Sequence, residues 1–181
     1  MSIQDDNILI NEVLKGKISS FGLLIDKYQK PVYNLIFNMV EDEDQAKDIV
    51  QDVFIKVYEK LESFNFKHKF FSWLYRIAIN DTINFLKNRK NFETLTEQNE
   101  IQEEKTTNDH KEEQRRQLHA ALRELRTDHR VLILLKYFFG LSYEEISDVM
   151  KIQEKMVKAR LFMAREKLRE VLIKNKFFEH D

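Results

Sequence analysis

The chain has 181 residues, room for one domain or two small ones, and three glycines and one proline are too few for the tight turns between β-strands. The absence of cysteine excludes a disulfide framework and thiolate metal ligands. No apolar run approaches the roughly 18 residues of a membrane-spanning helix, and an acidic pair stands where a signal peptide has positive charge. We therefore expect a cytoplasmic, all-helical protein.

The net charge of −1 hides alternating blocks of opposite sign. Residues 41–62 carry a net charge of −5 and residues 67–90 carry +5. Residues 91–114 carry −6 and residues 151–176 carry +6. A protein with a purely solvated surface mixes its charges more evenly, so the blocks indicate surfaces for different partners.

Residues 3–40 have apolar positions at helical spacing, broken near Gly16 and again before Pro31, which predicts two or three helices. Residues 44–61 form a clearer helix, since their acidic start suits the positive end of a helix dipole. Its predicted buried stripe comprises Ala46, Ile49, Val50, Val53, Val57 and Leu61.

The outward face of this helix is acidic but has an isoleucine in its midst. We predict a protein interface with an acidic rim for a basic partner, formed by Asp48, Gln51, Asp52, Ile55 and Glu59. An isolated exposed isoleucine without a function is the alternative.

Residues 62–70 break the helical pattern and form a loop rich in aromatic and basic residues, and a helix follows over residues 70–90. On that helix one side is apolar, while the chain's only tryptophan lies in line with amides and cations. Aromatic rings stack on unpaired bases, cations hold the backbone and amides reach base edges. The candidate residues for single-stranded nucleic acid are Phe64, Lys67, Lys69, Phe71, Trp73, Arg76, Asn80, Asn84 and Lys87. The alternative is a partly buried tryptophan with incidental polar neighbours.

Residues 91–114 contain few apolar side chains and no sustained period, which is the composition of a flexible acidic linker. A coil of this length spans roughly 27 Å, enough to hold two domains apart. We therefore place one small helical domain at residues 1–90 and a second at residues 115–181.

The second domain reads as four helices. Gly140 suits a helix end, and Ser142 with Glu145 forms a capping box for the next, short helix. A tight turn and a long basic helix follow, which is the outline of a helix-turn-helix.

The final helix has a core face formed by Val157, Leu161, Ala164, Leu168 and Val171. The opposite face offers cations for phosphates and apolar groups for base edges, and its candidate DNA-binding residues are Lys155, Lys158, Ala159, Phe162 and Arg165. An ordinary solvated amphipathic helix is the alternative.

Motifs for catalysis are missing from the sequence. The five histidines have no metal-ligand spacing, and neither a Gly-rich phosphate loop nor a cysteine nucleophile is present. We predict no catalytic residue, no metal and no cofactor, and hence a protein that is not an enzyme.

Three segments, in order, resemble the extracytoplasmic-function (ECF) sigma factors, the small two-domain sigma subunits of bacterial RNA polymerase in the sigma-70 superfamily. They are "DQAKDIVQDVFIKVYEKL", "FSWLYRIAINDTINFLKNRK" and "LSYEEISDVM…VKARLFMAREKLREVL". The resemblance covers about residues 8–90 and 117–173. It departs from the family in the turn before the last helix, where Lys151, Gln153 and Met156 stand in place of small or hydroxyl residues.

The resemblance implies a role for each segment. The first domain would bind and melt the −10 promoter element, and its acidic helix would dock on the β′ clamp helices of core RNA polymerase. The loop at residues 64–71 would capture a flipped base, and the acidic linker would thread through the polymerase channel. The second domain would read the −35 element and touch the β flap. An anti-sigma factor is a further partner that the family implies.

Two other functions are compatible with the residues alone. A dimeric helix-turn-helix regulator would bind a palindromic operator without being a polymerase subunit. A helical adaptor would show no salt-dependent DNA binding at all.

Overall fold

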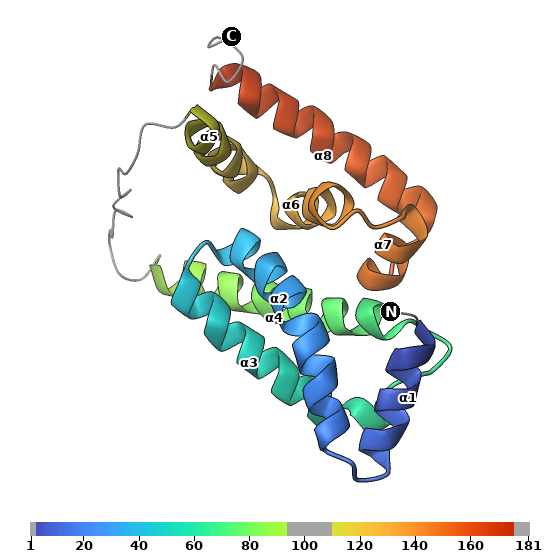
Figure 1. Ribbon diagram of the computed structural model, residues 1–181. Helices are drawn as coiled ribbons and strands as arrows, with labels where there is room; N and C mark the ends of the chain where they lie inside the picture. The colour runs from blue at the N-terminus through green and yellow to red at the C-terminus, as the bar shows by residue number, and fades with distance from the viewer. Residues whose placement is uncertain (1–2, 94–109, 176–181) are drawn as a thin grey trace.

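The computed structural model describes residues 3–93 and 110–175, which form two stacked groups of helices (Figure 1). The first group comprises α1 (Ile3–Leu14), α2 (Ser19–Val40), α3 (Glu43–Glu59) and α4 (Phe70–Glu93), with a 3-10 turn at Leu61–Ser63. The second comprises α5 (His110–Glu124), α6 (Thr127–Ile133), a π-helical turn at Leu134–Phe138, α7 (Tyr143–Met150) and α8 (Glu154–Lys174). The described residues contain no strand, which confirms the all-α class. None of their helices is long and apolar enough to cross a membrane.

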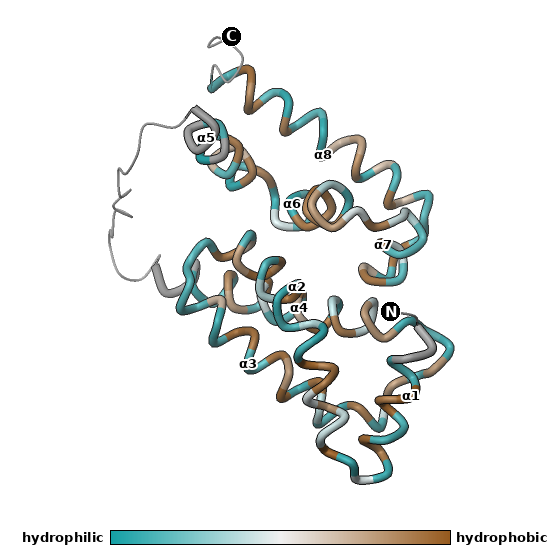
Figure 2. Tube along the Cα trace, in the orientation of Figure 1, coloured by the Kyte–Doolittle hydropathy of each residue, from teal (hydrophilic) through white to brown (hydrophobic). Residues whose placement is uncertain are grey.

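The first domain buries one apolar stripe from each of its helices in a common core. Val32, Leu35, Val53 and Leu74 are fully buried there. The brown segments of α2, α3 and α4 in Figure 2 mark the apolar stretches that alternate with hydrophilic ones along each helix.

Pro31 does not divide α2, contrary to the break predicted before it. It removes one backbone N–H from the helix ladder. Tyr28 and Val32, on either side of it, are buried in the core, and this packing keeps the segment helical. Residues 3–40 therefore form two helices.

A buried carboxylate holds α1 against α2. Asp6 is only 4% exposed, accepts a 2.6 Å hydrogen bond from the hydroxyl of Tyr28, and pairs with the ammonium of Lys27. Burial, reinforced by the bond to Asp6, raises the pKa of Tyr28 well above its usual range. The tyrosine is therefore a neutral donor at any physiological pH.

The acidic helix predicted from the sequence is α3. It begins where the Asp42 side chain accepts a 2.9 Å hydrogen bond from the backbone N–H of Gln45. Of its predicted buried stripe, Val50 is half-buried and the others are buried. The α-helix ends at Glu59, and Leu61 completes the stripe from the 3-10 turn.

The second domain has the predicted four helices and one feature that was not predicted, the π-helical turn after α6. The capping box of Ser142 and Glu145 is present, and Gly140 has a positive φ of 66°. Gln153, at the start of α8, makes no side-chain capping hydrogen bond. The outline of a helix-turn-helix is thus confirmed in α7 and α8.

Helix extends into both ends of the predicted linker at residues 91–114, since α4 ends at Glu93 and α5 begins at His110. Residues 94–109, which contain most of the predicted linker, lie outside the described residues.

The two domains contact each other directly. The guanidinium of Arg123 lies 2.6 Å from the carboxylate of Glu41, and Arg130 donates a 3.3 Å hydrogen bond to a carbonyl oxygen at the end of α2. The rings of Tyr75 on α4 and Phe139 pack edge to face with centroids 6.0 Å apart. The sequence predicts domains that a linker could hold apart, but these contacts dock one on the other.

Candidate nucleic-acid and protein interfaces

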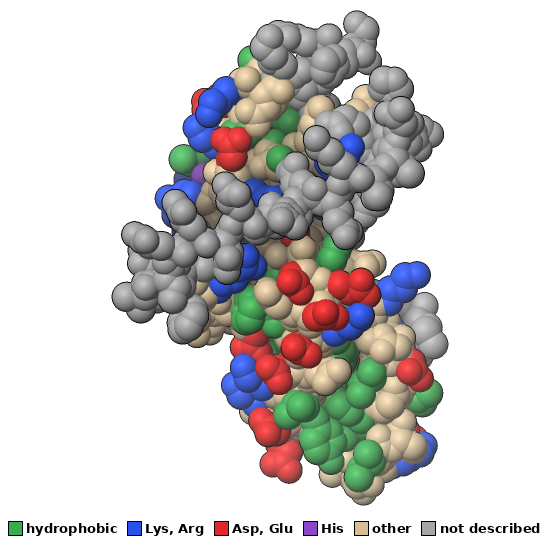
Figure 3. Space-filling view, turned by 90° about the vertical axis from the view of Figure 1, so that its left-hand side faces the viewer, with side chains coloured by type: hydrophobic (Ala, Val, Ile, Leu, Met, Phe, Trp, Pro, Cys, Tyr) green, Lys and Arg blue, Asp and Glu red, His purple; other side chains and the backbone are tan. Residues whose placement is uncertain are grey.

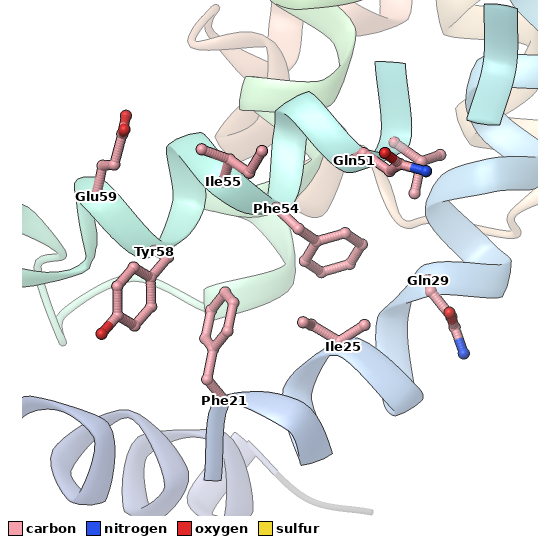
Figure 4. Close-up of a pocket in the computed structure, with 9 residues that line it drawn as sticks. Phe21, Ile25, Gln29, Gln51, Phe54, Ile55, Tyr58 and Glu59 are labelled. Atoms are coloured by element: carbon pink, nitrogen blue, oxygen red, sulfur yellow. The ribbon is translucent and has the colours of Figure 1, made fainter. Parts of the chain in front are cut away.

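An apolar groove of about 690 Å³ lies between the first half of α2 and α3 (Figure 4). The rings of Phe21 and Tyr58 meet edge to face across it, 5.1 Å apart. Ile55 is 56% exposed beside them and extends this apolar surface, and a contiguous exposed apolar patch indicates a binding site more than a single exposed side chain does. The residues that line the groove are Phe21, Ile25, Gln29, Val50, Gln51, Phe54, Ile55, Tyr58 and Glu59.

Carboxylates border this groove. The predicted interface residues Asp48, Gln51, Asp52, Ile55 and Glu59 are all exposed. Figure 3 looks onto the side where α3 lies, and shows hydrophobic side chains gathered in one area with acidic side chains along its edge. The sequence singled out only Ile55 as apolar here, because the α2 side of the groove becomes apparent only when the two helices pack.

The aromatic loop before α4 is anchored in the core. Phe64, a predicted DNA-binding residue, is only 5% exposed, and its ring lies 5.3 Å from that of Trp73 and 5.2 Å from that of Phe66. Phe64 therefore supports its neighbours in this conformation, whereas Phe66, 41% exposed, presents its ring at the surface. The sequence prediction included Phe64 and missed Phe66, because spacing within a loop does not show which ring points inward.

Lys67 is exposed, but Lys69 is half-buried and bound to the other domain. Its ammonium lies 3.0 Å from the carboxylate of Glu145 in α7 and 5.7 Å from the ring centre of Phe71. Burial alone would raise the pKa of Glu145, but the hydrogen bonds from Ser142 and the bond from Lys69 together outweigh burial and lower that pKa. Phe71 is half-buried against Tyr75.

On α4 the predicted stripe is graded in exposure along its length. Trp73 and Arg76 are half-buried, and Asn80, Asn84 and Lys87 are exposed. The stripe thus runs from an aromatic ring backed by Phe64 to two exposed amides and a cation.

One face of α8 presents all five predicted DNA-binding residues to solvent, namely Lys155, Lys158, Ala159, Phe162 and Arg165. Phe162 is 57% exposed, which favours a partner for this face. Arg165 donates a 3.4 Å hydrogen bond to the hydroxyl of Tyr137.

Glu154 and Tyr143, which contact Lys158, were not among the residues singled out from the sequence. The ammonium of Lys158 lies 2.6 Å from the carboxylate of Glu154 and 5.3 Å from the ring centre of Tyr143. The hydrogen bond to Glu154 raises the pKa of Lys158.

Among the described residues, no group of three or more His, Asp or Glu side chains could hold a metal ion. The arrangement instead combines an apolar groove with an acidic rim, an aromatic and amide stripe, and an exposed face on the second helix of the helix-turn-helix. A two-domain helical protein with these surfaces has the architecture of a DNA-binding transcription protein.

Comparison with known families shows which class of DNA-binding transcription protein this chain belongs to. Sigma-70 region 2 matches residues 24–92, and Sigma-70, region 4 matches residues 115–168. The RNA polymerase sigma-H factor of Pseudomonas aeruginosa is 33% identical over 93% of this chain and 94% of its own. The ECF RNA polymerase sigma-E factor of Escherichia coli is 35% identical over 89% of this chain and 91% of its own. The chain belongs to the ECF sigma factors of bacterial RNA polymerase.

Solved structures share the fold. The structure of CnrH in complex with the cytosolic domain of CnrY is 23% identical and has a TM-score of 0.73, covering 94% of this chain and 98% of that one. The sigma factor RpoE of Bartonella quintana, solved with the anti-sigma factor NepR, is 23% identical with a TM-score of 0.65, covering 84% of this chain and 96% of that one.

Proposed function

We propose that this protein directs core RNA polymerase to specific promoters and helps to melt the −10 region, without catalytic activity of its own. The observation that carries the proposal is the separation of three surfaces: the groove of α2 and α3, the stripe on α4 and the exposed face of α8. A specificity subunit needs such separation, because it must hold polymerase and two parts of a promoter at once.

The groove is suited to polymerase. An amphipathic helix could place its apolar side on Ile55 and Tyr58 while basic residues on its flanks meet Asp48 and Asp52. The acidic rim also repels DNA, which makes a protein the fitting occupant. We assign this surface to the β′ clamp helices.

The α4 stripe is suited to unpaired bases. A ring such as Phe66 or Trp73 can stack on a base, while Asn80 and Asn84 can bond base edges and Lys87 a phosphate. Strand separation exposes the groups that these side chains bind, so the binding energy favours the melted promoter.

The helix-turn-helix supplies the second contact with the promoter. A recognition helix enters the major groove, where Lys155 can neutralise a phosphate and Phe162 can contact a thymine methyl group. We assign this face to the −35 element and expect the same domain to touch the β flap.

The proposal extends to location and regulation. A subunit of bacterial polymerase works in the cytoplasm. We include an anti-sigma factor among the expected partners, because the similar RpoE was solved with one.

Reconstitution tests the proposal. We expect the purified protein to bind promoter DNA weakly alone, and to direct transcripts from a defined set of start sites when it is combined with core polymerase. Core polymerase without the protein is the control. A stable dimer that binds a palindromic site without polymerase would show that the chain is a conventional regulator.

A further inference from the structure

We propose that Glu154 and Lys158 act as one unit that recognises a cytosine–guanine base pair in the −35 element. The inference rests on the proposed function, since it requires α8 to enter the major groove of the promoter. It assigns sequence discrimination to an acidic residue at the start of the recognition helix.

The geometry holds these two side chains together at the surface. They lie one turn apart on α8, the carboxylate and the ammonium are 2.6 Å apart, and their side chains are 46% and 56% exposed. Tyr143, from α7, lies under the ammonium of Lys158 and also 4.7 Å from that of Lys136. The Lys158 side chain is therefore oriented by contacts from two helices, with Glu154 on α8 and Tyr143 on α7.

Exposed ion pairs within a helix usually add only a few tenths of a kcal/mol to stability. Glu154 also lies at the positive end of the α8 dipole, so the pair has a modest stabilising role, and its exposed position leaves it available for a second one. A carboxylate in the first turn of a recognition helix also affects DNA binding. It repels the DNA phosphates unless a base donates a hydrogen bond to it.

The chemistry of the pair matches one base pair. In the major groove cytosine presents the N4 amino donor, and guanine presents the O6 and N7 acceptors beside it. Glu154 can accept from the cytosine amino group while Lys158 donates to guanine. A carboxylate has two oxygens and an ammonium three hydrogens, so both can bond the bases without breaking their own contact.

Lys155 differs from Lys158 in having no ion-pair partner among the described residues, and it is exposed. Its full charge is free to neutralise a phosphate, whereas the charge of Lys158 is balanced by Glu154. Lys155 is thus the matched control for a lysine that contributes affinity without sequence preference.

The test uses the protein bound to core polymerase and promoters with a randomised −35 region. The wild type should select a cytosine–guanine pair at one position, and Glu154→Gln should lower that preference about tenfold while the other positions keep theirs. Lys158→Gln should affect the same position. Lys155→Gln should keep every preference and weaken binding uniformly, with a shallower dependence of affinity on salt by about one unit of slope.

The experiment distinguishes a failure of the Glu154–Lys158 recognition unit from a failure of the proposed promoter-binding function. An unchanged preference in Glu154→Gln, or a loss of salt slope in Lys158→Gln equal to that in Lys155→Gln, would overturn the recognition unit. Failure of the wild type to select any −35 sequence with polymerase would overturn the proposed function instead. Thermal unfolding of each variant, followed by circular dichroism, establishes that the domain is folded.

Discussion

Linking the two domains at Glu41 and Arg123 is expected to stop promoter-dependent transcription while leaving polymerase bound through the α2–α3 groove. The −10 and −35 elements lie about 25 base pairs apart, or about 85 Å at about 3.4 Å per pair. A compact chain of this length has a radius of gyration of about 16 Å. We therefore expect the docked domains to separate when both elements are bound.

The covalent chain permits this separation. The segment between Glu93 and His110 can extend to at most about 60 Å. The contacts to be broken include the pairs of Arg123 with Glu41 and of Lys69 with Glu145, the hydrogen bond from Arg130 to the end of α2, and the packing of α4 against α7 with the ring contact of Tyr75 and Phe139. The groove residues take part in none of them, so polymerase can dock before the domains open.

The absence of cysteine makes the experiment direct. Glu41→Cys and Arg123→Cys are joined by a bismaleimide whose spacer contains a reducible disulfide, and transcription is measured before and after reduction. Glu12→Cys with Lys17→Cys, joined in the same way within the first domain, is the control. Full transcription from the linked protein would contradict the need to open, and no recovery after reduction would indicate damage unrelated to the link.

Ile55→Asp is expected to weaken polymerase binding severely. The substitution places a carboxylate at the centre of an apolar groove that already has an acidic rim, so that a partner helix would bury an unpaired charge. A loss of 2 kcal/mol or more, typical of a central interface residue, corresponds to an affinity at least about 30-fold lower. Binding of labelled core polymerase in solution measures the effect.

The matched control is Ile8→Asp, since Ile8 on α1 is 55% exposed and Ile55 is 56% exposed. It should bind polymerase normally. Trp73→Ala should show the reverse of Ile55→Asp, with promoter opening impaired more than polymerase binding. Equal loss of polymerase binding and promoter opening in Trp73→Ala would mean that the two faces are not separate.

The sequence predicted best what short-range patterns determine. The capping box of Ser142 and Glu145 involves residues three apart, and the buried stripe of α3 follows from helical periodicity. The outward residues of α3 and α8 were predicted correctly as exposed for the same reason.

Features that depend on packing between distant segments were not predictable. Pro31 remains inside α2 because tertiary contacts outweigh its local effect. The burial of Phe64, the α2 side of the groove and the docking of Tyr75 on Phe139 all require partners far away in the sequence. The pairing of Glu154 with Lys158 could have been found, since the two are four residues apart on one helix.

The stripe of α4 should face the unpaired bases of the −10 element, and site-specific photocrosslinking tests this directly. A photoreactive group on Asn80→Cys, in the complex with core polymerase and promoter, should attach to the non-template strand of the −10 element once that strand is open. The same group on Lys47→Cys, exposed on α3, should not. Attachment from position 80 to closed duplex, or to no DNA at all, would contradict the account.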